Sequence, residues 1–281
     1  MIAGEAALSN WDAGMDMYIY GKLGNLTMTK EGINVLMTNL TGKVPPILQR
    51  LDYIRFNGEA AGYLHDLTLT GLFHTGAGMV KTDVMMSIDE QSMSRTYSGS
   101  VASADLDLGK LLNQEKKFGK VDFNVELKGF NYKNRYPESY IKGIISSFEY
   151  SQYQYENIML DGVYKDGGFN GRLSMDDANG SVQIDGNFNV AKTIPDFNLK
   201  ASVKNLRPHD LHLSDKYENA SISLGLTADF TGKSIDDMNG RHFIGQLQLN
   251  APDEGGCFLD NLTITAGQVS GEKELRIIHP S

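Results

Sequence analysis

The feature that most constrains the fold of this chain is a long alternation of apolar and polar residues. In residues 222–230, five apolar side chains occupy every second position, with Ser, Gly, Thr and Asp between them. At the ~100° step of a helix these five would scatter around the whole cylinder, whereas in a strand they share one side. The same alternation recurs in residues 121–127, 182–190 and 67–71. The sequence therefore predicts a sheet with one apolar and one polar face.

Short turns connect the expected strands. Asp166-Gly167 supplies the positive φ angles of a tight hairpin, and residues 176–180 and 193–196 make the next two turns. Parallel neighbours would need crossovers of about a dozen residues or more. Successive short turns therefore indicate an antiparallel meander.

Two segments interrupt the strand pattern. Pro45 and Pro46 suit a first helical turn and predict a short helix over 45–51. Residues 105–112 predict another, with Asp105 or Asp107 as the N-cap. The strands are expected at 16–20, 23–29, 33–40, 53–57, 63–74, 79–88, 95–103, 120–130, 140–150, 153–164, 169–175, 181–190 and 197–204, with hairpin turns at 21–22 and 30–32.

A weaker repeat places glycine two residues after an apolar residue, as in Leu69-Thr-Gly71, Leu127-Lys-Gly129 and Leu160-Asp-Gly162. Because the pleat has a period of two, these glycines fall on the apolar face. Glycine inside a strand marks a bend, a bulge or a close approach. Two readings follow: the glycines curve the sheet for packing, or they hollow out an apolar surface that holds a ligand.

Composition excludes several functions. A net charge of −9 argues against nucleic acid as a partner, and no basic cluster suits an anionic membrane surface. The lone Cys257 allows no internal disulfide. The N-terminus lacks the pattern of a signal peptide, and no apolar window reaches the length of a membrane-spanning helix.

No polar cluster predicts catalysis. His209 and His212 have a spacing that could hold zinc on a helix, but no third ligand lies nearby and Pro208 indicates a loop. The acidic pairs at 176–177 and 236–237 precede Asn-Gly, which is turn chemistry. An aromatic run at 148–155 could stack on sugars, although cross-strand packing explains it as well. The chain is not expected to be an enzyme, and no metal, cofactor or nucleotide is implied.

A succession of segments resembles the TamB family, AsmA-related proteins of double-membraned bacteria. The resemblance covers residues 95–266 and is thin before residue 53. It is carried by residues 97–112, 118–129, 153–164, 169–177, 228–240 and 259–266.

The resemblance implies a periplasmic location within an inner-membrane-anchored protein, whose anchor is not in this chain. It also implies a curled sheet that carries lipid acyl chains toward the outer membrane, and a partner in an outer-membrane barrel assembly protein reached through regions absent here. We accordingly expect residues 1–281 to be a single elongated β-groove segment of a longer protein, with a possible sub-boundary near 104–118.

The expected fold is all-β: a long, twisted, mainly antiparallel sheet curled into an open apolar trough, with a few short helices. The expected function is non-enzymatic passage of phospholipid or another amphiphile. A secreted β-sandwich that binds glycan or protein, a structural spacer and a transmembrane barrel remain alternatives. The expected groove lining is Phe123, Val125, Leu127, Ile158, Leu160, Val182, Ile184, Phe188, Phe197, Leu199, Ile222, Leu224, Leu226 and Phe230.

Overall fold

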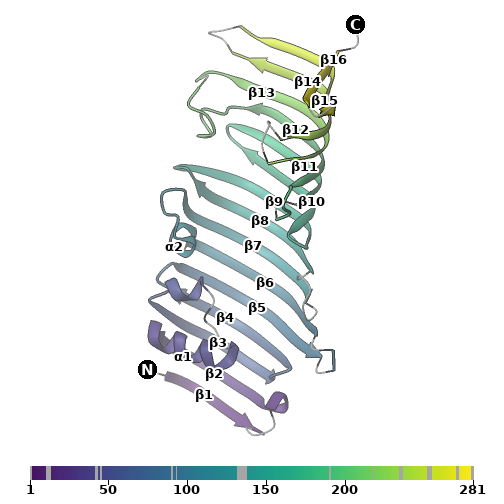
Figure 1. Cartoon of the computed structure of the whole chain (residues 1–281). Helices are drawn as coiled ribbons and strands as arrows, with labels where there is room; N and C mark the ends of the chain where they lie inside the picture. The colour runs from purple at the N-terminus through teal and green to yellow at the C-terminus, as the bar shows by residue number, and fades with distance from the viewer. Residues whose placement is uncertain are drawn as a thin grey trace. The chain divides into compact units, whose positions relative to one another are not determined.

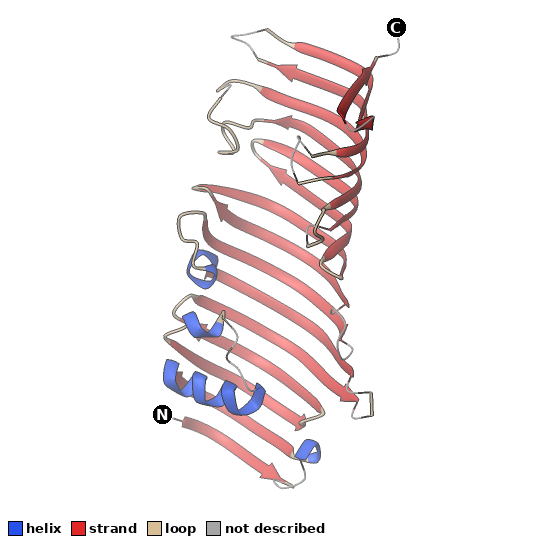
Figure 2. Ribbon diagram, in the orientation of Figure 1, coloured by secondary structure: helices blue, strands red, loops and turns tan. Residues whose placement is uncertain are grey.

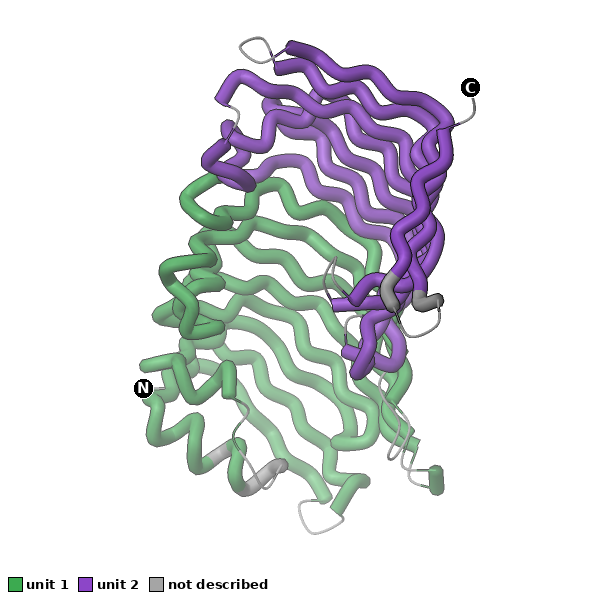
Figure 3. The backbone as a smooth tube through the Cα atoms, turned by 45° about the horizontal axis from the view of Figure 1, so that its top comes forward, with its two compact units in different colours: residues 1–154 green, residues 155–281 purple. Residues whose placement is uncertain are grey.

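A computed structural model shows an all-β chain whose strands follow one another in antiparallel order (Figure 1). Its contacts divide it into two compact units, Met1–Gln154 and Tyr155–Ser281 (Figure 3). The structure describes residues 2–10, 14–41, 44, 46–89, 91–92, 94–131, 138–189, 191–216, 218–233, 237–251, 255–269 and 272–279.

Unit 1 is a meander in which each strand pairs antiparallel with the next. The one-layer pairing follows from the short turns, since a hairpin can join only neighbouring antiparallel strands. Its strands are β1 (Ile2–Ser9), β2 (Tyr18–Thr29), β3 (Tyr53–Tyr63), β4 (Asp66–Thr75), β5 (Gly78–Asp89), β6 (Ser94–Asp107), β7 (Phe118–Asn131) and β8 (Glu138–Tyr150).

The α-helices α1 (Lys30–Thr41) and α2 (Leu108–Leu112) and the 3₁₀ turn η2 (Leu48–Arg50) lie at one end of the unit 1 strands (Figure 2). The 3₁₀ turn η1 (Gly14–Asp16), between β1 and β2, lies at the other end. The core lies under α1 and α2, where Ile33, Leu106, Leu111 and Val121 are buried together. Asp107 caps α2, because its side chain accepts a hydrogen bond from Lys110 N at 2.8 Å.

Unit 2 is a second meander of the same kind. Its strands bend along their length (Figure 3). They are β9 (Tyr153–Lys165), which begins two residues before the unit boundary, β10 (Gly168–Asp177), β11 (Gly180–Asn189), β12 (Asp196–Leu206), β13 (Ser221–Thr231), β14 (Asn239–Asn250), β15 (Cys257–Val269) and β16 (Glu272–Ile278).

Asn and Asp residues with positive φ interrupt four of the strands. Asp105, Asn157, Asn205 and Asn261 have φ between 47° and 55°, and each immediately precedes a Leu or Ile. The register shifts at Asp105 and Asn205 mark β-bulges. A bulge bends its strand and increases the local twist. These residues therefore help to curve the sheets, since Asn and Asp tolerate the left-handed conformation better than other side chains.

Glycines on the apolar side allow close approach between strands. Gly162, Gly171 and Gly186 face one another across β9, β10 and β11. A Cβ built on Gly171 would lie 2.3 Å from the Asp161 carbonyl oxygen, so only glycine fits there. At Gly162, the Cζ atom of Phe169 would lie 2.5 Å from such a Cβ. The neighbouring ring thus occupies the space that glycine leaves, which favours curvature over hollowing as the role of this repeat.

Three expectations for the N-terminal region need correction. Residues 33–40 form the helix α1 and not a strand, because Ile33 and Met37 lie one helical turn apart and both pack against the core. Residues 30–32 begin that helix and make no hairpin turn. Expected strands 16–20 and 23–29 are replaced by the single strand β2, in which Gly21 and Lys22 pair with Ala60 and Glu59.

The helix expected over 45–51 is reduced to η2, since Leu51 is already extended with a ψ of 128°. Pro45 lies outside the described residues. The helix expected at 105–112 is confirmed in its second half, with Asp107 as its cap. The fold class is confirmed: the chain is all-β and antiparallel, with only short helices.

Candidate ligand-binding face

The register of unit 2 places apolar side chains opposite one another from strand to strand. Leu160, Leu173, Ile184, Ala201, Leu226, Ile244 and Leu262 form one such row across β9 to β15. Residues directly opposite in an antiparallel pair point to the same side of the sheet. We define the apolar face of unit 2 by these residues together with Ile158, Phe169, Met175, Val182, Phe188, Phe197, Leu199, Val203, Ile222, Leu224, Phe230, Leu247, Leu249, Leu259 and Ile264.

Aromatic rings border this face on one side. Phe169, Phe188, Phe197 and Phe230 stand opposite one another on β10, β11, β12 and β13. The Phe197 and Phe230 rings are stacked with centroids 4.6 Å apart, and the Phe169 and Phe188 centroids are 5.5 Å apart. The row therefore forms an aromatic margin across four strands.

The 207–220 segment closes the opposite side of the apolar face. In its described part, Leu211 has no exposed surface, and its carbonyl oxygen accepts a hydrogen bond of 2.7 Å from the Tyr155 hydroxyl. Ala220, at the end of the segment, is also buried. The segment is held by backbone bonds of its own, such as Leu211 N to Arg207 O at 3.1 Å.

No second layer covers the middle of the face within the described part of unit 2. Every pair of elements in substantial contact there is a pair of adjacent strands. The central side chains of the face are half-buried, whereas most side chains on the opposite face are exposed. Because neither face has a covering layer, this difference indicates that the sheet bends toward its apolar side.

The total accessible surface of the chain is larger than that expected of globular domains of the same mass. The chain exposes 17648 Å² at a mass of 31.0 kDa. Two separate globular domains of half this mass would expose about 14,000 Å² together. Among the described residues, the only large side chains that are almost fully buried are Ile33 and Leu211. Much of the apolar surface of these sheets is therefore not sealed inside a core.

The opposite face of unit 2 is polar and carries paired charges. Asp161, Arg172, Asp185 and Lys200 alternate in sign across β9 to β12. Arg172 Nε lies 2.6 Å from Asp185 Oδ1, and Gln183 donates to Asp185 Oδ2 at 2.7 Å. The hydrogen bonds from Gln183 and Arg172 lower the pKa of the Asp185 carboxyl. This face suits contact with water.

His242 is the exception on the apolar face. It lies on β14, opposite Ala228 on β13 and Ile264 on β15, and only 9% of it is exposed. Its ring packs against Phe230 with centroids 4.8 Å apart. Its Nε2 atom is buried and has no hydrogen-bond partner among the described residues. Burial lowers the pKa of the imidazole, so the ring is neutral at pH 7.

Unit 1 has a similar apolar side. Phe123, Val125 and Leu127 on β7 stand opposite apolar residues or glycine on β6 and β8, except that Ser103 faces Phe123. Away from the helices, the Tyr97 ring lies over Gly129 and its hydroxyl contacts Ser139 Oγ. Aromatic contacts among Phe118, Phe148 and Tyr150 confirm cross-strand packing in that part of the aromatic run.

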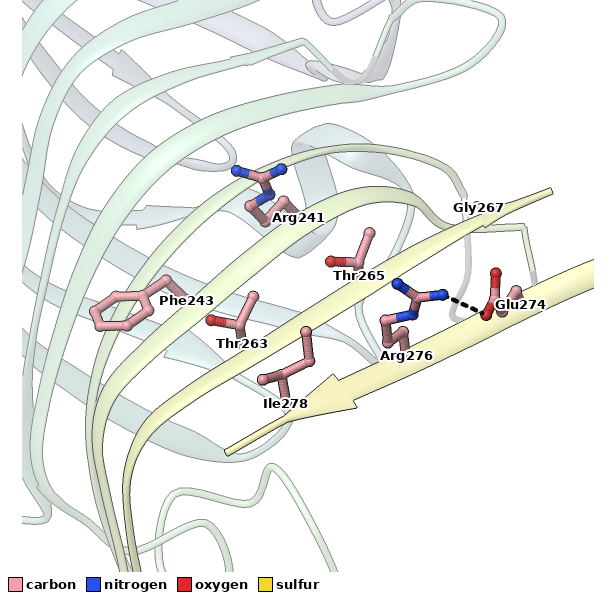
Figure 4. A pocket seen from close by; sticks show the side chains of 8 residues that line it. All are labelled: Arg241, Phe243, Thr263, Thr265, Gly267, Glu274, Arg276 and Ile278. Atoms are coloured by element: carbon pink, nitrogen blue, oxygen red, sulfur yellow. Dashed lines mark hydrogen bonds and ion pairs between the residues drawn. The ribbon is translucent and has the colours of Figure 1, made fainter. Parts of the chain in front are cut away.

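A separate hollow of about 710 Å³ lies on the polar face, over β14 to β16 (Figure 4). Arg241, Thr265 and Arg276 stand opposite one another there. Arg276 pairs weakly with Glu274 on its own strand at 3.4 Å. The remaining lining residues are Phe243, Thr263, Gly267 and Ile278. The hollow is open and mixed in character, and it shares no residue with the apolar face.

The polar clusters considered from the sequence lie in turns or at the strand end next to one. His209 contacts Asp210 at 3.6 Å within the 207–220 segment. Asp177 accepts hydrogen bonds from Asn179 N at 2.9 Å and from Glu156 N at 3.1 Å, which confirms turn chemistry. Asp236 lies outside the described residues. In the described part of the chain, no three His, Cys, Asp or Glu residues are grouped to hold a metal ion.

Nor does that part contain a helix with the length and apolarity to span a membrane.

The structure brings the expected lining residues onto apolar faces, divided between the units. Phe123, Val125 and Leu127 belong to unit 1, and the other expected residues to unit 2. Sequence reasoning missed the contributions of β14 and β15 and the residue His242. The alternation His242, Ile244 is present in the sequence, but the bulge after Ile244 shifts Leu247 and Leu249 out of phase with it. The sequence also contained no sign of the contact between Tyr155 and Leu211, which joins segments that are far apart in the chain.

Comparisons of the chain with protein-family models, with curated proteins and with solved structures give no match.

Proposed function

We propose that this chain is a non-enzymatic carrier segment whose apolar faces hold the acyl chains of phospholipid or a similar amphiphile. The observation that supports this most directly is the apolar face of unit 2, which extends across seven strands and whose middle has no covering layer among the described residues. Each CH₂ group removed from water gains about 0.8 kcal/mol. An acyl chain and this face would therefore each remove apolar surface of the other from water.

The dimensions of the face suit an acyl chain. Seven strands at ~4.8 Å spacing span about 29 Å. The hydrocarbon core of a bilayer is about 30 Å thick, so one extended chain reaches about half of that. The face therefore has room for an acyl chain in several positions, as expected for a path along which lipid moves.

The polar face supports the same proposal from the other side. Arg172 and Asp185 form an ion pair across strands on this face, and charges of opposite sign stand opposite one another beside them, so this face can stay in water while the apolar face binds lipid. We further propose that the chain is related to the TamB family and acts in the periplasm, on the segments that resemble that family. A glycan-binding or protein-binding module is the competing function.

Two neighbouring substitutions on opposite faces test the proposal. Leu226→Glu places a carboxylate on the apolar face, and Thr227→Glu places one beside Lys200 on the polar face. Lipid that co-purifies with the wild-type chain is measured by native mass spectrometry. We expect Leu226→Glu to stay folded and lose about tenfold in bound lipid, because desolvating an unpaired charge is costly. Thr227→Glu should match the wild type.

Circular dichroism confirms that each variant is folded. Absence of lipid from the wild-type chain, even after incubation with phospholipid vesicles, would contradict the proposal. Equal lipid retention by folded Leu226→Glu would mean that lipid does not contact this face.

A further inference from the structure

His242 is the unexplained group on the apolar face of unit 2. Its cross-strand neighbours are Ala228 and Ile264, and the next residues of β14 on the same side are Gly240 and Ile244. None of these can accept or donate a side-chain hydrogen bond. A buried polar atom without a partner destabilises a protein by about 1–3 kcal/mol. Any apolar residue at this position would avoid that cost.

Access to the imidazole of His242 depends on Phe230, because the other neighbours are small and closely packed. Ala228 and Ala266 are 1% and 2% exposed, and a Cβ on Gly240 would lie 2.2 Å from the Asp229 carbonyl oxygen. Phe230, which packs against the imidazole, is itself only half-buried at the margin of the face. Rotation of this one side chain would bring the ring nitrogen into contact with a molecule lying on the face. Side-chain rotations of this kind are common when ligands bind.

We infer that His242 binds the carbonyl or carboxyl oxygen of an acyl chain lying on this face. The inference rests on the proposed function and adds a chemical preference to it. A neutral imidazole can carry its proton on Nε2 and donate it to an ester or carboxylate oxygen. The hydrocarbon part of the ligand would then lie over the aliphatic rows, with its polar end near the Phe230 margin. Two ligand sources share this chemistry: a free fatty acid and an ester-linked phospholipid.

Matched lipids with and without a carbonyl test this inference. Binding of dioctanoyl-phosphatidylcholine, its dioctyl ether analogue, and octanoate is measured on the wild-type chain after lipid removal. We expect the ester to bind about three- to tenfold more tightly than the ether, as one added hydrogen bond would give. In His242→Phe this ratio should fall to about one, with the ether affinity unchanged.

His242→Gln retains a donor and should keep part of the preference. A change in the imidazole nitrogen resonance of the wild type on addition of ester, but not of ether, supplies a second readout that needs no variant. If only octanoate binding depends on His242, the source is a free fatty acid.

Two failures are distinguishable. If neither lipid nor octanoate binds the wild type, the proposed function itself is wrong. If His242→Phe leaves both the ester-to-ether ratio and the octanoate affinity at their wild-type values, the role of His242 is overturned while the carrier function stands.

Discussion

At the scale of single residues, the size and polarity of each side chain on the apolar face determine how its neighbours pack. Glycines there are sites of contact: Phe169 covers Gly162 and Tyr97 covers Gly129. His242 brings the opposite property, a polar atom where the neighbours are apolar. Substitutions at the glycines should therefore change packing, and the protonation of His242 should change stability.

Gly129→Ala should destabilise unit 1. A Cβ at this position would lie 2.1 Å from Tyr97 Cζ, so the ring must move and its hydroxyl must leave Ser139. Because the ring is the far end of a flexible, half-buried side chain, the cost is mainly that of the lost hydrogen bond, about 0.5–1.5 kcal/mol in the free energy of unfolding, measured by urea denaturation. Gly21→Ala is the matched control, because the nearest atom would lie 3.8 Å away. If both variants unfold at the same urea concentration, the packing of the Tyr97 ring over Gly129 does not contribute to stability.

His242 should make unfolding dependent on pH. Burial lowers its pKa in the folded chain, whereas in the unfolded chain the pKa is about 6.5. The unfolded state thus binds the extra proton first. The contribution of the neutral imidazole to the free energy of unfolding is fully present above about pH 6.5. It declines as the pH falls toward the lower pKa of the folded chain. No charged side chain stands among its neighbours on this face.

Thermal unfolding of wild type and His242→Phe between neutral and mildly acidic pH measures this effect. The variant should gain stability relative to the wild type as the pH falls. A constant difference across that range would show that His242 titrates normally in the folded chain.

At the scale of elements, each unit closes one end of its apolar side with a different device. Unit 1 uses α1, η2 and α2, whose side chains contribute to the buried core around Ile33 and Leu111. Unit 2 uses the 207–220 segment, which inserts Leu211 and is tied to β9 by the Tyr155 hydroxyl. The remaining strands are left as a single layer in each unit.

Two substitutions separate packing from hydrogen bonding in the unit 2 device. Leu211→Ala removes a fully buried side chain and should cost about 2–5 kcal/mol. Tyr155→Phe removes only the hydroxyl and leaves a buried carbonyl without that donor, which should cost about 1–3 kcal/mol. Hydrogen exchange should report faster exchange in the 207–220 segment for both variants. Unchanged exchange in Tyr155→Phe would mean that the 2.7 Å bond does not anchor the segment.

At the scale of the molecule, the large accessible surface and the small core have one consequence. Apolar contacts that a compact protein satisfies internally are available here to a ligand. The apolar face of unit 2 is half-exposed, so bound acyl chains should gain about half of the full transfer energy per CH₂.

A series of free fatty acids tests this consequence. Affinity should rise about twofold for each added CH₂ group, since half of ~0.8 kcal/mol corresponds to this factor. Bound fatty acid should also raise the unfolding temperature of the lipid-free chain. An affinity that does not depend on chain length would show that the fatty acids bind the polar face. The hollow lined by Arg241 and Arg276 would then be the candidate binding site.

The sequence by itself determined the strands and the division of their side chains. The period-two alternation sets which residues share a side, because the pleat has that period whatever the strand packs against. For this reason Leu224, Ile184 and Phe188 were assigned correctly to one face, and Asp166-Gly167 to a hairpin turn. The helix α1 was missed because Ile33 and Met37 satisfy a helical period only if a core exists on that side to receive them.

Only the tertiary structure decided what the apolar face meets. Alternation is the same for a sandwich, whose second sheet covers the face, and for a single curved layer. The bulges at Asp105 and Asn205, the glycine contacts and the contact of Tyr155 with Leu211 depend on the neighbouring strands or on segments far apart in the chain. Burial of His242 likewise arises from Phe230, Ala228 and Ile264, which lie on other strands. Such properties follow from register and curvature, and these are set by the whole sheet.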